Sequence, residues 1–271
     1  MSDLLPFSIN SPGDLIDRVY ECVTKKKPFA LVRIGDGENF LLAQNSIHTA
    51  EELIRMYSIV AGEGYSGIAI PNLPARDRLV DAVRKADVVG VLSQTDCYCW
   101  YPLTVKIFRY YSFCPPDTCY AFINRQCVSM PVFYELFRHT AILLIGKPMA
   151  RLRGILEDRY KFTNIRGVLN LRNYRDLDRV INSLPLLNFD LAFISAGANA
   201  KIVAAAVKDC GRVAFDLGHA ADGIISCDEQ GMYTWGPRYA SQRTARQAGI
   251  GVKKPASLPC VKINPQKRIR I

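Results

Sequence analysis

Short apolar runs alternate with longer segments of mixed polarity along most of this chain. The runs cover residues 28–34, 67–70, 87–93, 119–124, 141–145, 168–171, 189–194 and 211–215. Their length and their content of β-branched residues are typical of strands that are buried on both faces. The segments between them place apolar residues at helical spacing, and several begin with a capping residue or a proline. We expect helices at residues 11–27, 49–60, 74–85, 100–111, 131–138, 150–160, 176–184 and 200–208.

Strands that alternate with helices predict an α/β protein. The expected architecture is a Rossmann-like, mostly parallel, doubly wound sheet with helices on both faces. The length allows one large domain or two small ones, and we expect a single domain over residues 1–250. The periodic pattern fades after Ser226, and the last segment contains Pro259 and Pro265. Residues 251–271 are therefore expected to form a basic extended arm.

Composition narrows the class of protein. Hydrophobic residues make up 49% of the chain and charged residues 22%, which is typical of a globular protein and argues against disorder. No apolar run is long enough to span a membrane, and residues 1–6 lack the basic flank and long apolar core of a secretory signal. The nine cysteines include no Cys-x-x-Cys pair, which favours reduced thiols over a zinc site. These features predict a cytoplasmic protein in a reducing compartment.

Positive charge is concentrated near the C-terminus. The chain has 35 basic and 25 acidic residues, a net charge of +10, but no acid follows Glu229. Nine basic residues lie beyond that point, so the part before them carries only 26 − 25 = +1. Such a segment attracts phosphates, acidic glycans or the anionic headgroups at a membrane surface, although a solubilising tail has the same composition. We expect no nucleic-acid partner.

Two carboxylates follow the first buried run directly. Asp36 and Glu38 come after Gly35, where the predicted strand ends, and Gly37 separates them. Ligands of open α/β sheets gather beyond the carboxyl ends of the strands. Two carboxylates at this spacing can share one divalent cation, and the two glycines let a phosphate approach the backbone closely. The alternative is a plain Asp-Gly turn, although the segment after it lacks the alternation of a hairpin strand.

The sequence Arg33-Ile34-Gly35-Asp36-Gly37-Glu38 after an apolar strand resembles the signature of the GT-D glycosyltransferases, a bacterial family first described as a domain of unknown function. In that family an Asp-x-Glu element holds the metal of a nucleotide-sugar donor. The resemblance implies a GT-D type fold and a metal-dependent hexosyltransferase that uses Mn²⁺ or Mg²⁺. It also implies a nucleotide-diphosphate sugar, with a UDP-sugar preferred, and an acceptor that is a glycan, a glycoprotein or a lipid-linked glycan.

Other strand ends supply candidate partners for the donor phosphates. Each has a second interpretation: the glycines suit tight turns, and Arg33, which lies inside a strand, could instead pair with a buried acid. The candidates for binding the nucleotide-sugar are Arg33, Gly35, Gly37, Gly146, Lys147, Ser195 and Gly197.

A transfer that inverts the sugar also requires a base for the acceptor hydroxyl. Asp216, His219 and Asp96 all follow predicted strands, and Asp222 could orient the histidine. Asp216 resembles the acidic residue after the last strand in GT-D-like sequences. Two further functions remain open from the residues alone. They are metal-dependent phosphoester hydrolysis and a non-catalytic module that binds an acidic polymer through the basic tail.

Overall fold

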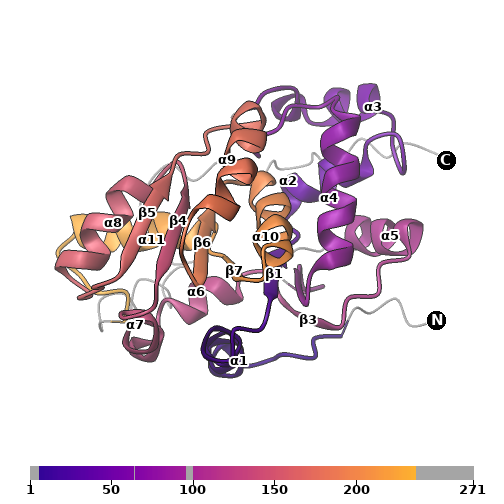
Figure 1. Cartoon of the computed structure of the whole chain (residues 1–271). Helices are drawn as coiled ribbons and strands as arrows, with labels where there is room; N and C mark the ends of the chain where they lie inside the picture. Colours follow the sequence, from indigo (N-terminus) through magenta and orange to yellow (C-terminus); the bar gives the residue numbers. More distant parts are fainter. Residues whose placement is uncertain (1–5, 64, 96–99, 236–271) are drawn as a thin grey trace. The chain divides into compact units, whose positions relative to one another are not determined.

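A computed structural model of the chain describes residues 6–63, 65–95 and 100–235 (Figure 1). Three sequence predictions lie outside these residues: the candidate base Asp96, the domain boundary at residue 250, and the basic arm over residues 251–271. Cys97, Cys99 and Cys260 lie outside them as well.

The described residues form a seven-stranded sheet in which every pair of neighbouring strands is parallel. Its order is β3-β2-β1-β7-β6-β4-β5, so the first strand lies in the interior, between the second and the last. The strands are β1 Phe29–Arg33, β2 Val88–Val91, β3 Asp117–Tyr120, β4 Ile142–Gly146, β5 Ile165–Leu169, β6 Leu191–Ser195 and β7 Val213–Asp216. The predicted parallel α/β fold is confirmed.

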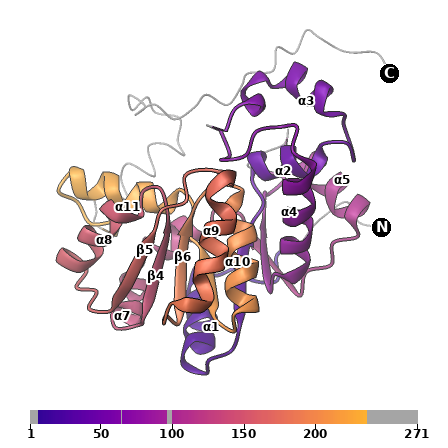
Figure 2. The same cartoon turned by 45° about the horizontal axis from the view of Figure 1, so that its top comes forward.

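Helices cover both faces of this sheet, as Figures 1 and 2 show. One face carries α2 Asp36–Ala43, α3 Ala50–Met56, η1 Ser58–Ala61, α4 Leu73–Lys85, α5 Tyr101–Tyr111, α9 Leu177–Ser183, η3 Leu184–Leu186 and α10 Asn199–Asp209. The other carries α1 Pro12–Thr24, α6 Ile123–Cys127, α7 Pro131–Phe137, α8 Met149–Asp158 and α11 Ala220–Glu229. A short turn, η2 Tyr174–Asp176, precedes α9.

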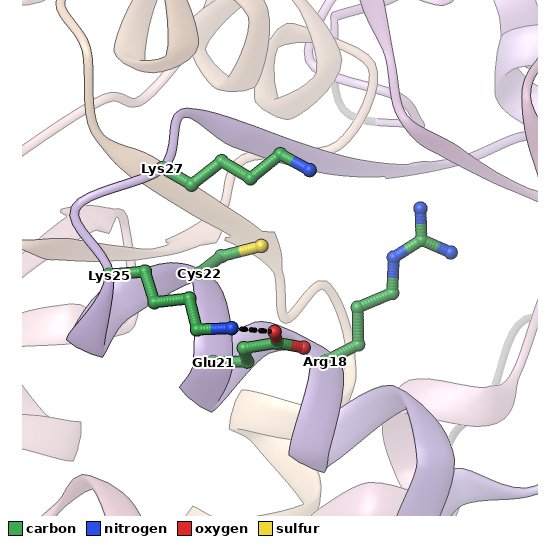
Figure 3. Close-up of a pocket in the computed structure, with 5 residues that line it drawn as sticks. All are labelled: Arg18, Glu21, Cys22, Lys25 and Lys27. Carbon is green, nitrogen blue, oxygen red and sulfur yellow. Dashed lines mark hydrogen bonds and ion pairs between the residues drawn. The ribbon is translucent and has the colours of Figure 1, made fainter.

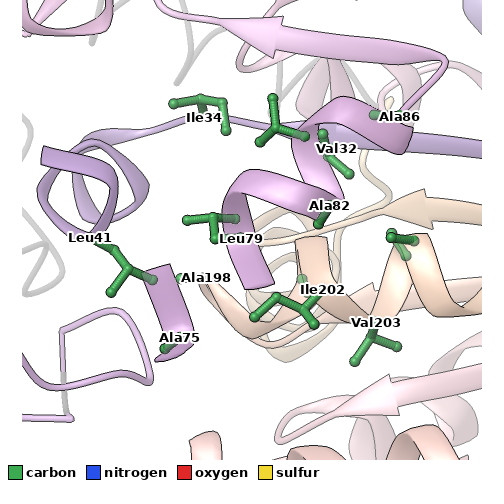
Figure 4. Packing of buried hydrophobic residues seen from close by; sticks show 14 of the residues in the cluster. Val32, Ile34, Leu41, Ala75, Leu79, Ala82, Ala86, Ala198, Ile202 and Val203 are labelled. Carbon is green, nitrogen blue, oxygen red and sulfur yellow. The ribbon is translucent and has the colours of Figure 1, made fainter. Parts of the chain in front are cut away.

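Alternating side chains on each strand divide the core into two layers. On β1, Ala30 and Val32 pack in the first layer and Phe29 and Leu31 in the second, and all four are buried. Because both layers are apolar, the strand reads as a continuous apolar run. Figure 4 shows the first layer, where β1 meets α4 and α10.

Capping residues fix several helix starts as the sequence indicated. The Ser11 hydroxyl accepts hydrogen bonds from the amides of Gly13 at 3.1 Å and Asp14 at 3.4 Å, at the start of α1. At α3, the Thr49 hydroxyl accepts from the Glu52 amide at 3.1 Å, and the Glu52 carboxylate accepts from the Thr49 amide at 2.8 Å. A cap of this kind contributes about 1 kcal/mol to stability.

The structure corrects the predictions for three elements, of which the predicted strand at 168–171 lies earlier, at Ile165–Leu169. Residues 67–70 form no strand, because Ile68 and Ile70 are buried in an irregular segment over the helical layer rather than in the sheet. Their burial gives the apolar signature of a strand without its pairing. The predicted strand at 119–124 begins and ends earlier, at Asp117–Tyr120, and residues 123–127 are helical.

Two findings concern the environment of the chain. Within the described ranges, no helix is long and apolar enough to cross a membrane. The six described cysteines are free thiols, and burial raises the pKa of Cys119 to about 12. That thiol therefore stays protonated and serves as a packing residue.

Candidate functional site

The acidic pair starts a helix at the carboxyl end of β1. Gly35 is the N-cap of α2, and Asp36 and Glu38 lie in its first turn. The Glu38 carboxylate turns back and accepts a hydrogen bond from the Gly35 amide through Oε2 at 2.9 Å. Negative charge in a first turn is favoured by the exposed amides there. The plain hairpin-turn alternative is therefore wrong, and the pair sits where a parallel sheet places its ligands.

The topology makes this edge a switch point between neighbouring strands. β1 and β7 are neighbours, but the chain leaves β1 toward the first face through α2 and leaves β7 toward the second face through α11. Adjacent strands that send their connections to opposite faces leave a crevice between those connections.

Four charged side chains meet in the interior beside this switch point, and we call them the buried tetrad. They come from β1, α2, α10 and β7, and they are Arg33, Glu38, Lys201 and Asp216, with exposed fractions of 9%, 7%, 3% and 0%. Two positive and two negative groups balance each other. Removing one partner would leave a buried charge unpaired, at a cost of about 3–5 kcal/mol.

Lys201 is the centre of the tetrad. Its ammonium lies 2.7 Å from Glu38 Oε1 and 3.1 Å from Asp216 Oδ2, and it also donates to the Gly197 carbonyl at 3.1 Å. The two carboxylates thus share one cation that the chain itself supplies.

Arg33 completes the tetrad on the β7 side. Its Nη2 lies 3.1 Å from Asp216 Oδ1, its Nε donates to the Asp216 carbonyl at 3.0 Å, and its Nη1 donates to the Ala121 carbonyl at 2.9 Å. Of the two interpretations of Arg33, pairing with a buried acid is the one that the geometry realises.

Asp216 is held in its ionised form. Burial alone would raise the pKa of this carboxyl, but the positive charges and hydrogen bonds of Arg33 and Lys201 outweigh burial, so that its pKa lies below the usual range. A carboxylate of this kind takes up no proton near neutral pH. The geometry therefore gives Asp216 the task of holding two cations in place.

Asp36 differs from Glu38 in being exposed. Its Oδ1 accepts from the Gly37 amide at 2.8 Å, and its Oδ2 accepts from the Tyr65 hydroxyl. Beside it, the rings of Tyr57, Tyr65 and Trp100 surround buried Phe40, with ring centres 4.7, 6.1 and 4.9 Å from that of Phe40. This aromatic group stands next to the only exposed acid of the α2 first turn.

The contacts of Asp36 and Glu38 show which of their oxygens are open to a divalent cation. Both Glu38 oxygens are engaged, one by Lys201 and one by the Gly35 amide. Within the described ranges, this edge included, no group of three or more His, Cys, Asp or Glu side chains gathers as a metal site. The residues fit a cation held by Asp36 together with phosphate oxygens and water, a donor set that Mg²⁺ accepts. A cation chelated by Asp36 and Glu38 together would have to share a Glu38 oxygen with Lys201 or the Gly35 amide, or displace one of them, and this predicted metal pair stays a prediction.

The remaining donor candidates lie along the same edge and use their glycines for packing. Gly146 faces Ser195 across β4 and β6, where an added Cβ would lie 2.0 Å from the Ser195 carbonyl oxygen. Gly197 faces Ser66 in the same way at 2.3 Å, and the neighbouring Ala198 amide donates to the Ser66 carbonyl. Lys147 is exposed, three strand positions from β1, or about 14 Å away. Their contacts with a donor stay a prediction.

His219 lies at the start of α11, just beyond the end of β7. Its side chain is 82% exposed, and its Nδ1 lies 3.0 Å from Asp222 Oδ2. This pairing was anticipated from the sequence, and it leaves Nε2 facing solvent. An imidazole held by a carboxylate in this way can accept a proton.

Sequence reasoning missed several polar residues at this edge. Lys201 is the main one, with the buried amides of Asn39, Asn124 and Asn199. The Oδ1 atoms of these three asparagines accept no hydrogen bond. One signal was available: Lys201 is the only charged residue in the apolar stretch Ala200-Lys201-Ile202-Val203-Ala204, where a solvent-facing lysine is unexpected.

A small cavity lies at the opposite, amino-terminal edge of the sheet, before the start of β1 (Figure 3). It measures about 80 Å³ and is lined by Arg18, Glu21, Cys22, Lys25 and Lys27. Arg18 is already paired with Asp117 at 2.5 Å, and Lys25 with Glu21 at 2.5 Å. The cavity contains none of the predicted site residues.

Comparisons with known proteins agree with this architecture. A family model for the GT-D fold-like domain matches residues 10–224. No curated protein matches significantly.

Three solved structures share the fold. One is a selenomethionine-substituted domain of unknown function 1792, with TM-score 0.51, 19% identity, and coverage of 82% of this chain and 87% of that chain. A second, described as domain of unknown function 1792 with a distinct glycosyltransferase fold, has a TM-score of 0.50 and 18% identity, and the match covers 82% of this chain and 87% of that chain. A third, described as a new glycosyltransferase from Streptococcus sanguinis, has a TM-score of 0.51 and 17% identity, and the match covers 80% of this chain and 84% of that chain. At identities of 17–19%, the likeness to these structures shows a shared fold and nothing further.

Proposed function

The chain belongs to the GT-D-like family, and on this premise we propose that it is a glycosyltransferase of the hexosyltransferase type. It transfers a sugar from a nucleotide-diphosphate sugar, preferably a UDP-sugar, to a glycan, a glycoprotein or a lipid-linked acceptor. One observation supports this most: an exposed carboxylate, Asp36, opens a helix at the carboxyl end of β1, beside a neutral buried tetrad and partly exposed aromatic rings. Such an edge offers polar anchoring, ring stacking and a fixed backbone in one place.

The proposed donor site is centred on Asp36. Mn²⁺ or Mg²⁺, held by this carboxylate and the donor's diphosphate, would offset the negative charge that grows on the leaving nucleotide. The Tyr65 hydroxyl fixes the Asp36 carboxylate by donating to its Oδ2. Tyr57 and Trp100, whose ring centres lie 5.3 Å apart with their planes tilted by 51°, each offer a ring on which the sugar or the base could stack.

The buried tetrad is proposed to hold this edge rigid. Through Glu38 it fixes the first turn of α2, and through Asp216 it ties the end of β7 to that of β1. A rigid edge lowers the cost of orienting the donor. We assign the base to His219, whose Nε2 faces solvent while Asp222 holds Nδ1. The acceptor hydroxyl would give its proton to that nitrogen.

Calorimetric titration of UDP-, GDP- and TDP-sugars, with Mn²⁺ and with chelator, tests the proposal. The variants are Asp36→Asn and the matched control Asp77→Asn, which removes an exposed aspartate on α4. We expect one nucleotide class to bind in the presence of Mn²⁺, with affinity lowered about tenfold or more by Asp36→Asn and unchanged by the control. Absence of binding by every donor, or equal binding by both variants, would contradict the proposal.

A further inference from the structure

We propose that the ammonium of Lys201 is the resident cation of Glu38, in place of a divalent metal. The resemblance to the family assigns the metal to an Asp-x-Glu element, and here the glutamate of that element is ion-paired to a lysine of α10. Lys201 is therefore a positioning residue of the proposed donor site, and the metal of this chain is left to Asp36.

The first argument is geometric. Glu38 Oε1 lies 2.7 Å from the Lys201 ammonium, and Oε2 lies 2.9 Å from the Gly35 amide nitrogen. A metal ion at Glu38 would have to share an oxygen with one of these two donors or displace it. The amide is fixed as the N-cap of α2, so the lysine is the group that a displacing ion would have to move.

The second argument is confinement. Lys201 is 3% exposed, and its nitrogen is also bound by Asp216 at 3.1 Å and by the Gly197 carbonyl at 3.1 Å. Leaving would strip this nitrogen of three oxygen partners and leave Asp216 with Arg33 alone. A desolvated ammonium without partners is strongly unfavourable.

The third argument is charge. The tetrad is neutral as it stands, with two cations and two anions. A divalent ion added beside Lys201 would bring it to +2 within a few ångströms of two fixed cations, where repulsion is poorly screened. Replacing Lys201 by a neutral side chain would instead leave a charge of −1 that attracts a metal.

The test measures Mn²⁺ binding directly, by electron paramagnetic resonance of the free ion in titrations without nucleotide. The variants are Lys201→Met, Glu38→Gln and the double variant. Lys208→Met is the matched control, since Lys208 lies on the same helix and pairs with Asp87 at 2.7 Å, away from the carboxyl edge.

We expect Lys201→Met to bind Mn²⁺ about tenfold or more tightly than the unchanged protein. Lys208→Met should not, and the double variant should lose the gain. Glu38→Gln alone should lower Mn²⁺ affinity by no more than about threefold, because Glu38 is not a metal ligand there and only the charge of +1 left on the tetrad acts on the ion.

A tenfold loss of Mn²⁺ affinity in Glu38→Gln would overturn the inference, because it would make Glu38 a metal ligand despite Lys201. A folded Lys201→Met that gains no affinity would overturn it as well. If Lys201→Met does not fold, the Glu38→Gln titration decides the question. The inference rests on the proposed function, because it concerns the metal of the proposed donor site. The Mn²⁺ titration contains no nucleotide-sugar, so the two are tested separately. If no nucleotide-sugar bound, the proposed function would be refuted, but the Mn²⁺ titration would still decide whether Glu38 is a metal ligand.

Discussion

Gly218→Ala tests the buried tetrad through a single added methyl group. Gly218 follows β7 with a φ of +47°, and a Cβ at this position would lie 1.8 Å from Arg33 Nη2. The arginine would have to move, although its nitrogens bind the Asp216 carboxylate, the Asp216 carbonyl and the Ala121 carbonyl. The substitution therefore combines backbone strain with damage to a buried ion pair.

The two contributions can be separated by a second glycine. Gly211 has a φ of +77°, but an added Cβ there meets nothing within 4 Å. Gly211→Ala should therefore cost about 1 kcal/mol, the strain of a left-handed alanine. Gly218→Ala should cost that strain and about 3 kcal/mol more, because displacing one partner of a buried pair costs about 3–5 kcal/mol.

Urea denaturation followed by circular dichroism measures the loss of unfolding free energy in each variant. In thermal melts, at about 2–4 °C per kcal/mol, the melting temperature should fall by about 8–16 °C in Gly218→Ala and about 2–4 °C in Gly211→Ala. Equal losses in the two variants, with equal denaturant slopes, would refute the claim that Arg33 fills the space beside Gly218.

Three further predictions concern Asp216, Tyr65 and His219. The pKa of Asp216 is lower in the folded state than in the unfolded state, so its charge stabilises the fold above about pH 4 and this contribution is lost as the pH falls further. The difference in unfolding free energy between the unchanged protein and Asp216→Asn should therefore shrink between pH 7 and pH 3 in urea titrations. A difference that grows would contradict this. Tyr65→Phe should weaken Mn²⁺-dependent donor binding about tenfold or more in calorimetry, the worth of one hydrogen bond to a charged group, whereas Tyr110→Phe, on an exposed ring, should have no effect. His219→Gln should lower kcat about 100-fold or more with little change in donor KM, and His139→Gln should change neither; an unaffected kcat would remove His219 from the proposed mechanism.

The sheet was predictable because its strands are buried on both faces. β4 reads as an unbroken apolar run, and β1 and β6 are apolar except for Arg33 and Ser195 at their carboxyl ends, since their buried side chains meet a helical layer on each face of the sheet. The same signal failed at Ile68 and Ile70, where burial under an irregular segment produces apolar residues without a strand. α11 was missed because small residues and scattered acids give its Ala220–Glu229 segment little periodicity.

At the site, local features were predictable and long-range pairs were not. Asp36, Glu38 and the His219–Asp222 pair lie close in sequence, so their spacing and the strand ends before them indicated their place. The partner of Glu38 comes from α10, far along the chain, and only the folded sheet brings Lys201 to it. Spacing alone therefore suggested a shared metal, whereas the fold provides a lysine.

The central claim is that a nucleotide-diphosphate sugar binds at the carboxyl end of β1. A crystal structure with UDP and Mn²⁺ tests it most directly, because it locates the diphosphate itself. The account predicts the diphosphate and the metal at Asp36, with Lys201 still bound to Glu38. Nucleotide bound instead in the cavity between Arg18 and Lys27, at the other end of the sheet, would contradict it.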